Sequence, residues 1–411
     1  MVGHPAEPPP PLLIAGATVV SPDGVWSPGW LAAAGGRIQS MGPGEAPGGV
    51  RTEIGALGVV VDGAGGVLLP GFIDVHVHGG DDADAMDADA DGLRRMARFH
   101  ARHGVTALLP TTWSAPPDAL EAAVGAIAAT VGPVDGGATI LGAHLEGPWI
   151  NPTRAGAQDP AGIRPPDVAE ARRLMDARPG TVRLVAVAPE MYGAGELIAE
   201  CVARGVVVSA GHTEAGWEEM QAAVRLGVRH VTHTFNAMAG LGHRDPGTVG
   251  AALALPELRC ELIADGHHVH GGAMAVLARA KGSRGVILIS DAVRAAGLPE
   301  GDVDLGGRPA QHCCGAVRLP DGRLAGSVLT LDVAVRNFAA ATGWGWIDLA
   351  RAAAGNAAEA LGLSTKGRLV RGFDADLVLL RDDGSGEVLL TVAEGRVVHA
   401  VDNQGHNRDR P

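Results

Sequence analysis

The chain has 411 residues, 46% of them hydrophobic, and carries a formal net charge of −13 with no basic block. This length suits one large domain plus a smaller one, and the acidic balance argues against nucleic acid or an anionic membrane surface as a partner. A few placed arginines can still bind a phosphate, so an anionic small-molecule substrate stays open.

The four cysteines are too few for a disulfide framework in so long a chain, and none has CxxC spacing. For Cys313–Cys314 we favour a pair in a loop or hairpin over a thiol site. The first residues, MVGHPAEPPPP, do not form a signal peptide, and no run reaches the roughly 18 apolar residues of a membrane span. We therefore expect a cytoplasmic protein with a disordered lead-in at 1–11 and a frayed polar tail.

Short strands joined by Gly/Pro turns are predicted at both ends of the chain. The first 70 residues contain LLIAGATVVSPDG and GWLAAAGGRIQSMG, and the end contains GFDADLVLLRDD and EVLLTVAEGRVVHA. We expect the two segments, 1–70 and 364–411, to pair into one small β-sandwich domain.

Between them, residues 71–363 alternate apolar strand runs with Ala-rich helical stretches. The runs are 72–78, 105–111, 140–147, 182–190, 206–212, 230–236, 260–266 and 285–292. The helical stretches are 91–104, 118–131, 167–178, 194–205, 216–227 and 271–282. Eight strand runs in this pattern predict an α/β fold of the (β/α)8 TIM-like barrel type, with an open α/β sheet as the structural alternative.

Polar residues recur where these runs end, which in a (β/α)8 barrel is the catalytic rim. Six of the eight runs deliver His, Asp or Glu there: His76 and His78, Glu146, His212, His233, Asp265, and Asp291. One such histidine is more often a hydrogen-bonded core residue, which is our expectation for His144. As a set, imidazoles and carboxylates at one barrel mouth indicate a divalent transition metal with an open position for water.

A bridge between two ions is a further question, because many two-metal barrels use a carboxylated lysine. The chain has two lysines, Lys281 and Lys366, and neither lies at a strand end. Glu146 is the remaining candidate, since a carboxylate can hold one metal or bridge two. The histidine pairs leaning on it would be His76/His78 and His212/His233. Asp291 is suited to take a proton from water and return it to a leaving group.

Eight motifs occur in order along the chain: PGFIDVHVHGG, LGAHLEGPWINP, SAGHT, THTFNAM, HRDPG, IADGHHV, ISDA and LAGSVLTLD. Together they resemble the N-acetylglucosamine-6-phosphate deacetylase family of the amidohydrolase superfamily. HxH alone is moderately specific, whereas HLEGP with THTFNAM and ADGHHV is much more so. The resemblance covers nearly the whole chain, including the closing segment KGRLVRGFDADLVLL.

The resemblance implies a role for each matching residue. The main metal ligands would be Glu146, His212 and His233, with a second site at His76 and His78 that only some members fill, and Asp291 as catalytic acid/base. The substrate contacts would be Ala157, Gln158, Asn236, Ala237, Arg244, His268, Leu324, Ala325 and Gly326. The residue matching Arg244 crosses a dimer interface in the family, so a homodimer is implied, and an Arg or His suits a phosphate.

Gln158 departs from the family, which typically has a His there that polarises the amide carbonyl. A Gln amide can still donate a hydrogen bond but cannot be cationic. Losing an oxyanion donor outright costs about 10²–10³ in rate, and a Gln replacement should cost less. This departure bears on the choice of substrate more than on the type of reaction.

We therefore expect metal-dependent removal of the acetyl group from N-acetyl-D-glucosamine 6-phosphate. The alternatives are deacetylation of another, possibly unphosphorylated, acetamido sugar, and a non-catalytic barrel that binds a sugar phosphate. The expected cofactor is one or two divalent ions per subunit, zinc first, with iron or another transition metal as alternatives.

Overall fold

The structure, a computed structural model, describes residues 7–401 of the chain. The expected disorder at 1–11 and fraying of the tail therefore concern, for the most part, residues outside those described. Where the lead-in is described, the Pro11 carbonyl accepts a hydrogen bond from the Val59 N–H at 2.8 Å, which ties it to the small domain.

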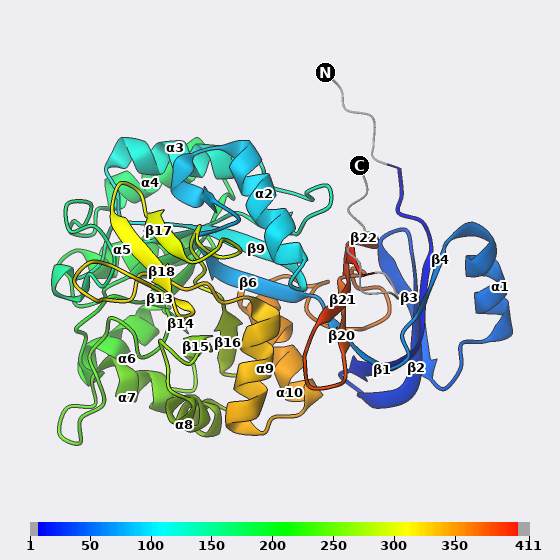
Figure 1. The fold of residues 1–411 in the computed structure, drawn as a ribbon. Helices are drawn as coiled ribbons and strands as arrows, with labels where there is room; N and C mark the ends of the chain where they lie inside the picture. The colour runs from blue at the N-terminus through cyan, green and yellow to red at the C-terminus, as the bar shows by residue number, and fades with distance from the viewer. Residues whose placement is uncertain (1–6, 402–411) are drawn as a thin grey trace.

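Parallel strands form the centre of the larger domain, and helices surround them (Figure 1). The barrel strands are β6 (Phe72–Val77), β9 (Val105–Thr112), β11 (Ala143–Glu146), β12 (Val182–Val187), β13 (Val207–Ala210), β14 (His230–Val231), β15 (Arg259–Ile263) and β16 (Val286–Ile289), with β10 (Thr139–Ile140) beside β9. Backbone hydrogen bonds from Asp291 N to His76 O and from His78 N to Ala292 O join the last strand's end to the first. The predicted barrel is confirmed, and an open sheet is not formed.

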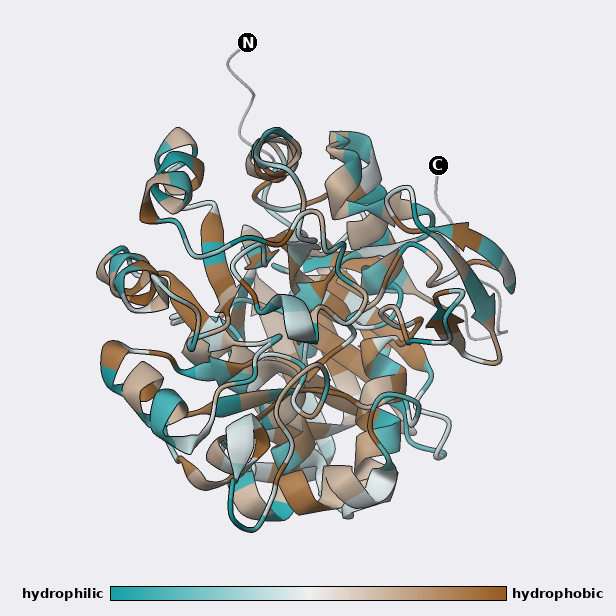
Figure 2. Ribbon diagram, turned by 90° about the vertical axis from the view of Figure 1, so that its left-hand side faces the viewer, coloured by the Kyte–Doolittle hydropathy of each residue, from teal (hydrophilic) through white to brown (hydrophobic). Residues whose placement is uncertain are grey.

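Burial on both faces explains why the strand runs read as continuously apolar. Every residue of β6 and β9 is buried, because the strands pack on the barrel interior and on the outer helices. Figure 2 shows the helices around the central strands, where many of the hydrophobic residues lie.

The six predicted helical stretches are confirmed as α2 (Ala90–Ala101), α3 (Pro117–Ala128), α4 (Val168–Ala177), α5 (Ala194–Ala203), α6 (Trp217–Leu226) and α8 (Gly271–Lys281). Local signals fix their ends: the Asp167 side chain, for example, accepts the backbone N–H groups of Ala169 and Glu170 at the start of α4. In the larger domain, the helices not anticipated from the sequence are α7 (Gly247–Ala254), α9 (Leu331–Thr342), α10 (Trp346–Ala350), and α11 (Asn356–Ala360), which follows the π-helical turn η3 (Arg351–Gly355).

The two ends of the chain form one eight-stranded sheet. Its strands are β1 (Leu12–Ser21), β2 (Gly24–Ala34), β3 (Arg37–Pro43), β4 (Val59–Asp62), β5 (Gly66–Pro70), β20 (Leu377–Arg381), β21 (Val388–Ala393) and β22 (Arg396–Ala400), with the helix α1 (Gly48–Leu57) inserted after β3. Side chains of β1, β2 and β3 share a buried cluster with those of β20 and β21, so the sheet folds over a core as a sandwich does. The boundaries at 70/71 and 363/364 stay a prediction.

Short elements after the barrel strands shape its mouth. They are β7 (Gly79–Gly80), β8 (Ala83–Asp84), η1 (Ala85–Asp87), η2 (Pro152–Arg154), and the three-stranded sheet β17 (Gly301–Asp304), β18 (Pro309–Cys313) and β19 (Ala316–Arg318). The Cys313–Cys314 pair lies in the β18–β19 hairpin, as favoured from the sequence, and both thiols are free and exposed.

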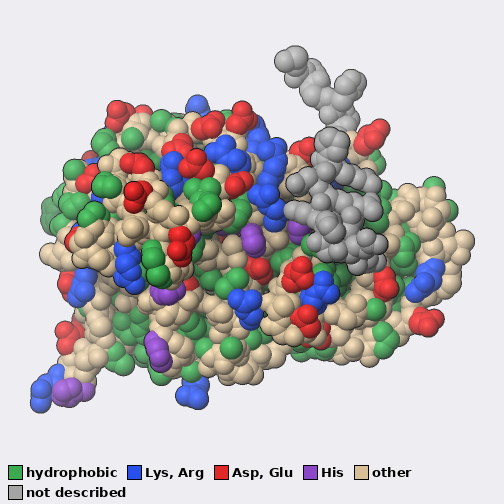
Figure 3. Space-filling model, in the orientation of Figure 1, with side chains coloured by type: hydrophobic (Ala, Val, Ile, Leu, Met, Phe, Trp, Pro, Cys, Tyr) green, Lys and Arg blue, Asp and Glu red, His purple; other side chains and the backbone are tan. Residues whose placement is uncertain are grey.

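Charged side chains on the face of Figure 3 include basic groups gathered over α2, next to acidic ones. These are paired in part: Arg94 lies 2.7 Å from Asp91 and Arg102 lies 3.2 Å from Asp81. Within residues 7–401, none of the helices combines the length and the apolar character needed to cross a membrane.

Candidate active site

The predicted rim residues come together at the carboxyl ends of the barrel strands. Glu146 ends β11, whereas His212, His233 and Asp291 each follow the end of their strand, β13, β14 and β16, by two residues. These last three have positive φ angles of 48°, 27° and 49°. Such backbone is costly for non-glycine residues and concentrates at functional sites, where the surrounding structure holds it in place.

The motif HVHGG is shaped by close approach of two chain segments. His78 and Gly79 both donate their backbone N–H to the Ala292 carbonyl, at 2.8 Å each. A Cβ at Gly79 would lie 2.3 Å from the Ala83 carbonyl oxygen and 2.6 Å from the backbone nitrogen of Arg294. Only glycine therefore fits directly after the histidine pair.

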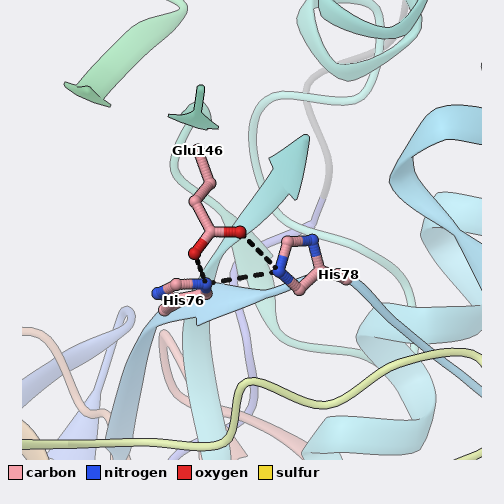
Figure 4. A group of neighbouring side chains, drawn as sticks. All are labelled: His76, His78 and Glu146. Carbon is pink, nitrogen blue, oxygen red and sulfur yellow. Dashed lines mark hydrogen bonds and ion pairs between the residues drawn. The ribbon is translucent and has the colours of Figure 1, made fainter. Parts of the chain in front are cut away.

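Five side chains form two groups of three that share one carboxylate. Within each group the potential ligand atoms lie within 4.8 Å of one another. The first is His76, His78 and Glu146, shown in Figure 4. The second is Glu146, His212 and His233. Glu146 Oε1 lies 3.1 Å from His212 Nε2 and 2.8 Å from His233 Nε2, while its Oε2 lies 3.3 Å from His78 Nε2. Glu146 thus stands between both histidine pairs.

The spacing of these atoms fits metal ligation. A tetrahedral ion held at about 2.05 Å from two nitrogens places them about 3.3 Å apart. The Nε2 atoms of His76 and His78 are 3.3 Å apart, and those of His212 and His233 are 3.1 Å apart. The donor set of imidazoles and a carboxylate also suits a divalent transition metal.

Three of the four histidines have their second ring nitrogen fixed by an acceptor. Nδ1 of His78 donates to the Thr111 carbonyl at 3.1 Å, and Nδ1 of His212 donates to the Arg154 carbonyl at 2.8 Å. Nδ1 of His76 donates to the Glu261 carboxylate at 3.1 Å. Because these acceptors occupy Nδ1, Nε2 is the ring nitrogen that faces the shared carboxylate and that would bind a metal.

The electrostatics of the site favour positive charge between the carboxylates. Burial alone would lower the pKa of the His78 imidazole, but hydrogen bonds to Asp291 and Glu146 outweigh it and raise the pKa to about 10. Burial acts on His233 in the same way, and Glu146 raises its pKa to about 9. Burial would raise the pKa of the Glu146 carboxyl, yet the imidazoles of His76 and His212 hold it well below its usual range. A site of this kind is prepared for a cation.

Asp291 lies against the first histidine pair. Its Oδ1 is 3.2 Å from His78 Nε2 and 3.4 Å from His76 Nε2. Burial would raise its pKa, but His76 and His78 together hold the pKa below the usual value. The carboxylate is thus ionised beside the ligand cluster, where it can accept a proton from a bound water.

Gln158 is held in one orientation by two neighbours. Its Oε1 accepts the backbone N–H of Ser114 at 2.6 Å, and its Nε2 donates to Glu146 Oε2 at 2.5 Å. A backbone N–H can only donate, which fixes the amide orientation. The position of Gln158 beside the shared carboxylate was not foreseen, because it depends on how the 147–167 loop folds back.

A cavity opens above this cluster and receives most of the predicted substrate contacts. Its walls include Ala157, Gln158, Asn236, Ala237, His268, Leu324 and Gly326. Ala325 is buried between the last two and does not line the cavity. Arg244 lies in the exposed segment before α7 and does not reach the cavity of its own chain.

Several residues of the site were not anticipated from the sequence. The Trp113 ring stacks on His78 with centroids 3.9 Å apart and forms part of the cavity wall. Arg323 also lines the cavity and donates to Asp321 Oδ2 at 2.6 Å. Asp265, noted only as a strand end, accepts Nδ1–H of His268 at 2.6 Å and leaves Nε2 of that ring available to a ligand. A Trp directly after a buried strand run is the one signal that could have marked Trp113.

A (β/α)8 barrel whose strand ends present two histidine pairs around a shared carboxylate defines a metal-dependent hydrolase. In agreement, the model of the amidohydrolase family matches residues 67–398.

Known proteins narrow the class further. The chain is 38% identical over 351 residues to an N-acetylglucosamine-6-phosphate deacetylase of Lysinibacillus sphaericus, covering 85% of this chain and 90% of that protein. It is 43% identical over 277 residues to an N-acetylgalactosamine-6-phosphate deacetylase of Escherichia coli O157:H7, covering 67% and 73%. A Mycobacterium smegmatis N-acetyl-D-glucosamine-6-phosphate deacetylase mutant, solved in complex with N-acetyl-D-glucosamine-6-phosphate, superimposes with a TM-score of 0.87 at 34% identity, covering 94% of this chain and 99% of that one. The chain therefore belongs to the N-acetylglucosamine-6-phosphate deacetylase family of amidohydrolases, which confirms the resemblance.

Proposed function

We propose that the protein hydrolyses the acetamido bond of N-acetyl-D-glucosamine 6-phosphate to give glucosamine 6-phosphate and acetate. The observation that carries this proposal is the pair of ligand groups sharing Glu146, which lie at the floor of a cavity lined by His268 and Asn236. The similarity to deacetylases of this substrate along most of the chain supports it.

The metal would be held by Glu146, His212 and His233, and a second ion by His76 and His78 with the same carboxylate. When bound, a divalent metal supplies an acidified water and a Lewis acid for the acetyl carbonyl. Zinc is our first choice, because buried imidazole and carboxylate ligands at this spacing suit its tetrahedral geometry.

Asp291 moves the proton in the proposed reaction. One of its carboxylate oxygens accepts a proton from the attacking water, and the same oxygen then returns it to the sugar nitrogen as the carbon–nitrogen bond breaks. The oxygen of the water becomes part of the acetate. The position of Oδ1 beside both His76 and His78 supports this role.

The Gln158 amide has two hydrogens, and only one is needed for its bond to Glu146. The second is free to meet the acetyl carbonyl, so Gln158 and its neighbour Ala157 face the reacting end of the substrate. Asn236, Ala237, Leu324, Ala325 and Gly326 complete the proposed substrate contacts.

The phosphate would be held by His268 and by Arg244 of a second subunit. Arg244 is exposed and does not line the cavity of its own chain, whereas a phosphate is best bound by an arginine fork. We therefore propose a homodimer in which each subunit completes the phosphate site of the other.

Acetate release measured with metal-loaded protein tests this function. N-acetylglucosamine 6-phosphate should be turned over with a far higher kcat/KM than unphosphorylated N-acetylglucosamine, because Arg244 and His268 would be left without an anion. No acetate from the phosphorylated sugar would overturn the proposal.

A second candidate substrate is N-acetylgalactosamine 6-phosphate, which differs at one hydroxyl group. The observation that favours it is the 43% identity to a deacetylase of that sugar. The ratio of kcat/KM for the two epimers decides between them.

We also propose a cytoplasmic location, because four cysteines without CxxC spacing do not make a disulfide framework in a chain of this length.

A further inference from the structure

Glu261 is a carboxylate at the base of the active site that the proposed reaction does not use. It lies on β15 and is completely buried. We propose that Glu261 is a positioning residue that fixes His76 as a metal ligand, so that the group of His76, His78 and Glu146 holds a second ion in this protein. This inference rests on the proposed metal site but not on the identity of the substrate.

The contact between Glu261 and His76 sets the direction of the imidazole ring. Glu261 Oε2 lies 3.1 Å from His76 Nδ1, and an ionised carboxylate can only accept a hydrogen bond. The proton of His76 is therefore on Nδ1. Its Nε2 lone pair then points to the side where His78 Nε2 and Glu146 Oε1 lie, at 3.3 and 3.4 Å.

His76 differs in this respect from the other three ligand histidines. His78 and His212 donate to backbone carbonyls, and His233 Nδ1 has no hydrogen-bond partner among the residues that the structure describes. A carboxylate partner makes an imidazole a stronger donor to a metal than a backbone carbonyl does. Among the four ligand histidines, the carboxylate hydrogen bond at Nδ1 therefore belongs to His76, in the pair His76/His78. The sequence did not show whether a metal ion binds at that pair.

Apart from His76, the side chain beside Glu261 among the described residues is His230, whose ion-pair contact with it is longer. His230 Nδ1 is 3.6 Å from Oε1, beyond a hydrogen bond, and Oε1 has no hydrogen-bond partner among residues 7–401. The remaining contact is a long one, from the His233 backbone N–H to Oε2 at 3.4 Å. A fully buried carboxylate is costly unless a cation compensates it.

The charges of the cluster agree with two ions. Glu146, Asp291 and Glu261 are three buried carboxylates, and within residues 7–401 no lysine or arginine forms an ion pair with any of them. With neutral imidazoles, one divalent ion leaves one negative charge in the barrel, which either a second ion or a proton on the His76/His78 pair compensates, and the zinc count below decides between these. Two ions exceed the carboxylates by one charge, which a bound anion from solvent balances.

The experiment is a zinc titration of the metal-free protein against a competing chelator, with zinc per subunit counted by elemental analysis. The wild type should bind two ions in separate steps. In Glu261→Gln the amide oxygen still accepts from His76, but the negative charge is lost, so affinity for one of the two ions should fall about 10–100-fold. Glu261→Ala should weaken the same ion further, and the other ion should keep its wild-type affinity.

Asp376→Asn is the matched control, because Asp376 is also a buried carboxylate but lies in the small domain. It should leave both zinc affinities unchanged. Wild-type affinity for both ions in Glu261→Ala, or equal weakening of both, would overturn the proposal. A wild-type chain that binds only one zinc would also overturn it, while leaving the deacetylase function standing if acetate is still released.

Discussion

Two charge clusters, one at the barrel mouth and one in the small domain, pair their carboxylates with different kinds of partner. In the small domain, Lys366 Nζ lies 2.8 Å from Asp376, 3.1 Å from Glu394 and 3.2 Å from Asp374. At the barrel mouth, Glu146 is surrounded by imidazole nitrogens at 2.8–3.4 Å.

The difference lies in what the partner groups supply. Lysine brings a permanent charge and three donors, and together with Arg37 beside Asp374 it offsets most of the negative charge of the small-domain carboxylates within the chain. Burial alone would lower the pKa of the Lys366 amino group, but Asp376, Glu394 and Asp374 outweigh it and raise the pKa above its usual value. Imidazoles that donate through Nδ1 bring lone pairs instead, so the cluster at the mouth is completed by a cation from outside. The first arrangement holds the fold, and the second holds a cofactor.

At the barrel mouth, replacing Asp291 should give the largest effect, and the effect should be on kcat. Asp291→Asn keeps the shape of the side chain but cannot accept the proton, so kcat should fall about 10²–10⁴-fold. Steady-state acetate release measures it, with elemental analysis to confirm that metal remains bound. Asp302→Asn, an exposed carboxylate on β17, is the control and should keep full activity. Undiminished kcat in Asp291→Asn would remove Asp291 from the reaction.

Replacing Lys366 should act on stability instead. Lys366→Met leaves the buried Asp376 without its cation, while Asp374 keeps Arg37 at 2.7 Å and Glu394 is 34% exposed, so the free energy of unfolding should fall by about 3 kcal/mol. Denaturant unfolding measures this, and kcat/KM of the folded protein should not change. Lys281→Met, at the only other lysine, should cost less, because Lys281 Nζ donates only to the Leu255 carbonyl among the described residues. Equal stability of Lys366→Met and the wild type would contradict a structural role for the small-domain cluster.

The buried His100 should make the free energy of unfolding depend on pH. It packs behind the histidine pair and donates Nε2–H to the Gly79 carbonyl, and its complete burial lowers the pKa of the imidazole from 6.5 to about 4. The unfolded chain binds this proton below about pH 6.5 and the folded chain only below about 4. Stability from the neutral ring is thus present above pH 6.5 and is lost as pH falls to 4, by about 3 kcal/mol.

The difference in unfolding free energy between the wild type and His100→Gln isolates this contribution. Gln keeps a donor for Gly79 but does not titrate, so the difference should change by about 3 kcal/mol from pH 6.5 to pH 4. A difference independent of pH would show that His100 is protonated to the same extent in both states.

Arg244 should give the smallest effect, and only on the phosphorylated substrate. Losing one charged hydrogen-bond partner costs about 1.5–3 kcal/mol, so Arg244→Ala should lower kcat/KM about 10–100-fold. The rate with unphosphorylated sugar should not change. Arg284→Ala, exposed at the opposite end of the barrel before β16, is the control. Equal losses on both sugars would assign Arg244 a role other than phosphate binding.

The barrel and the rim residues could be predicted from the sequence because both follow from position along a strand. Parallel strands read as apolar runs, and polar residues at their carboxyl ends meet at one mouth. Glu146, His212 and Asp291 needed no knowledge of the loops to be placed there.

Residues whose role depends on loop conformation or on the far end of a strand could not be placed in this way. Gln158 reaches Glu146 only because its loop folds back over β11. Trp113 follows β9 and stacks on His78, which follows the neighbouring strand β6. Glu261 lies inside the apolar run CELIADG, four residues before Asp265 and therefore on the same strand face. A charged residue within an apolar strand was its one signal, and the sequence did not show which histidine it would meet.

The most direct test of the central account is one measurement of metal content and acetate release on the same sample. Protein stripped with a chelator should release no acetate from N-acetylglucosamine 6-phosphate, and activity should return in step with bound zinc as the metal is added back. Full acetate release by the stripped, metal-free protein would contradict the account.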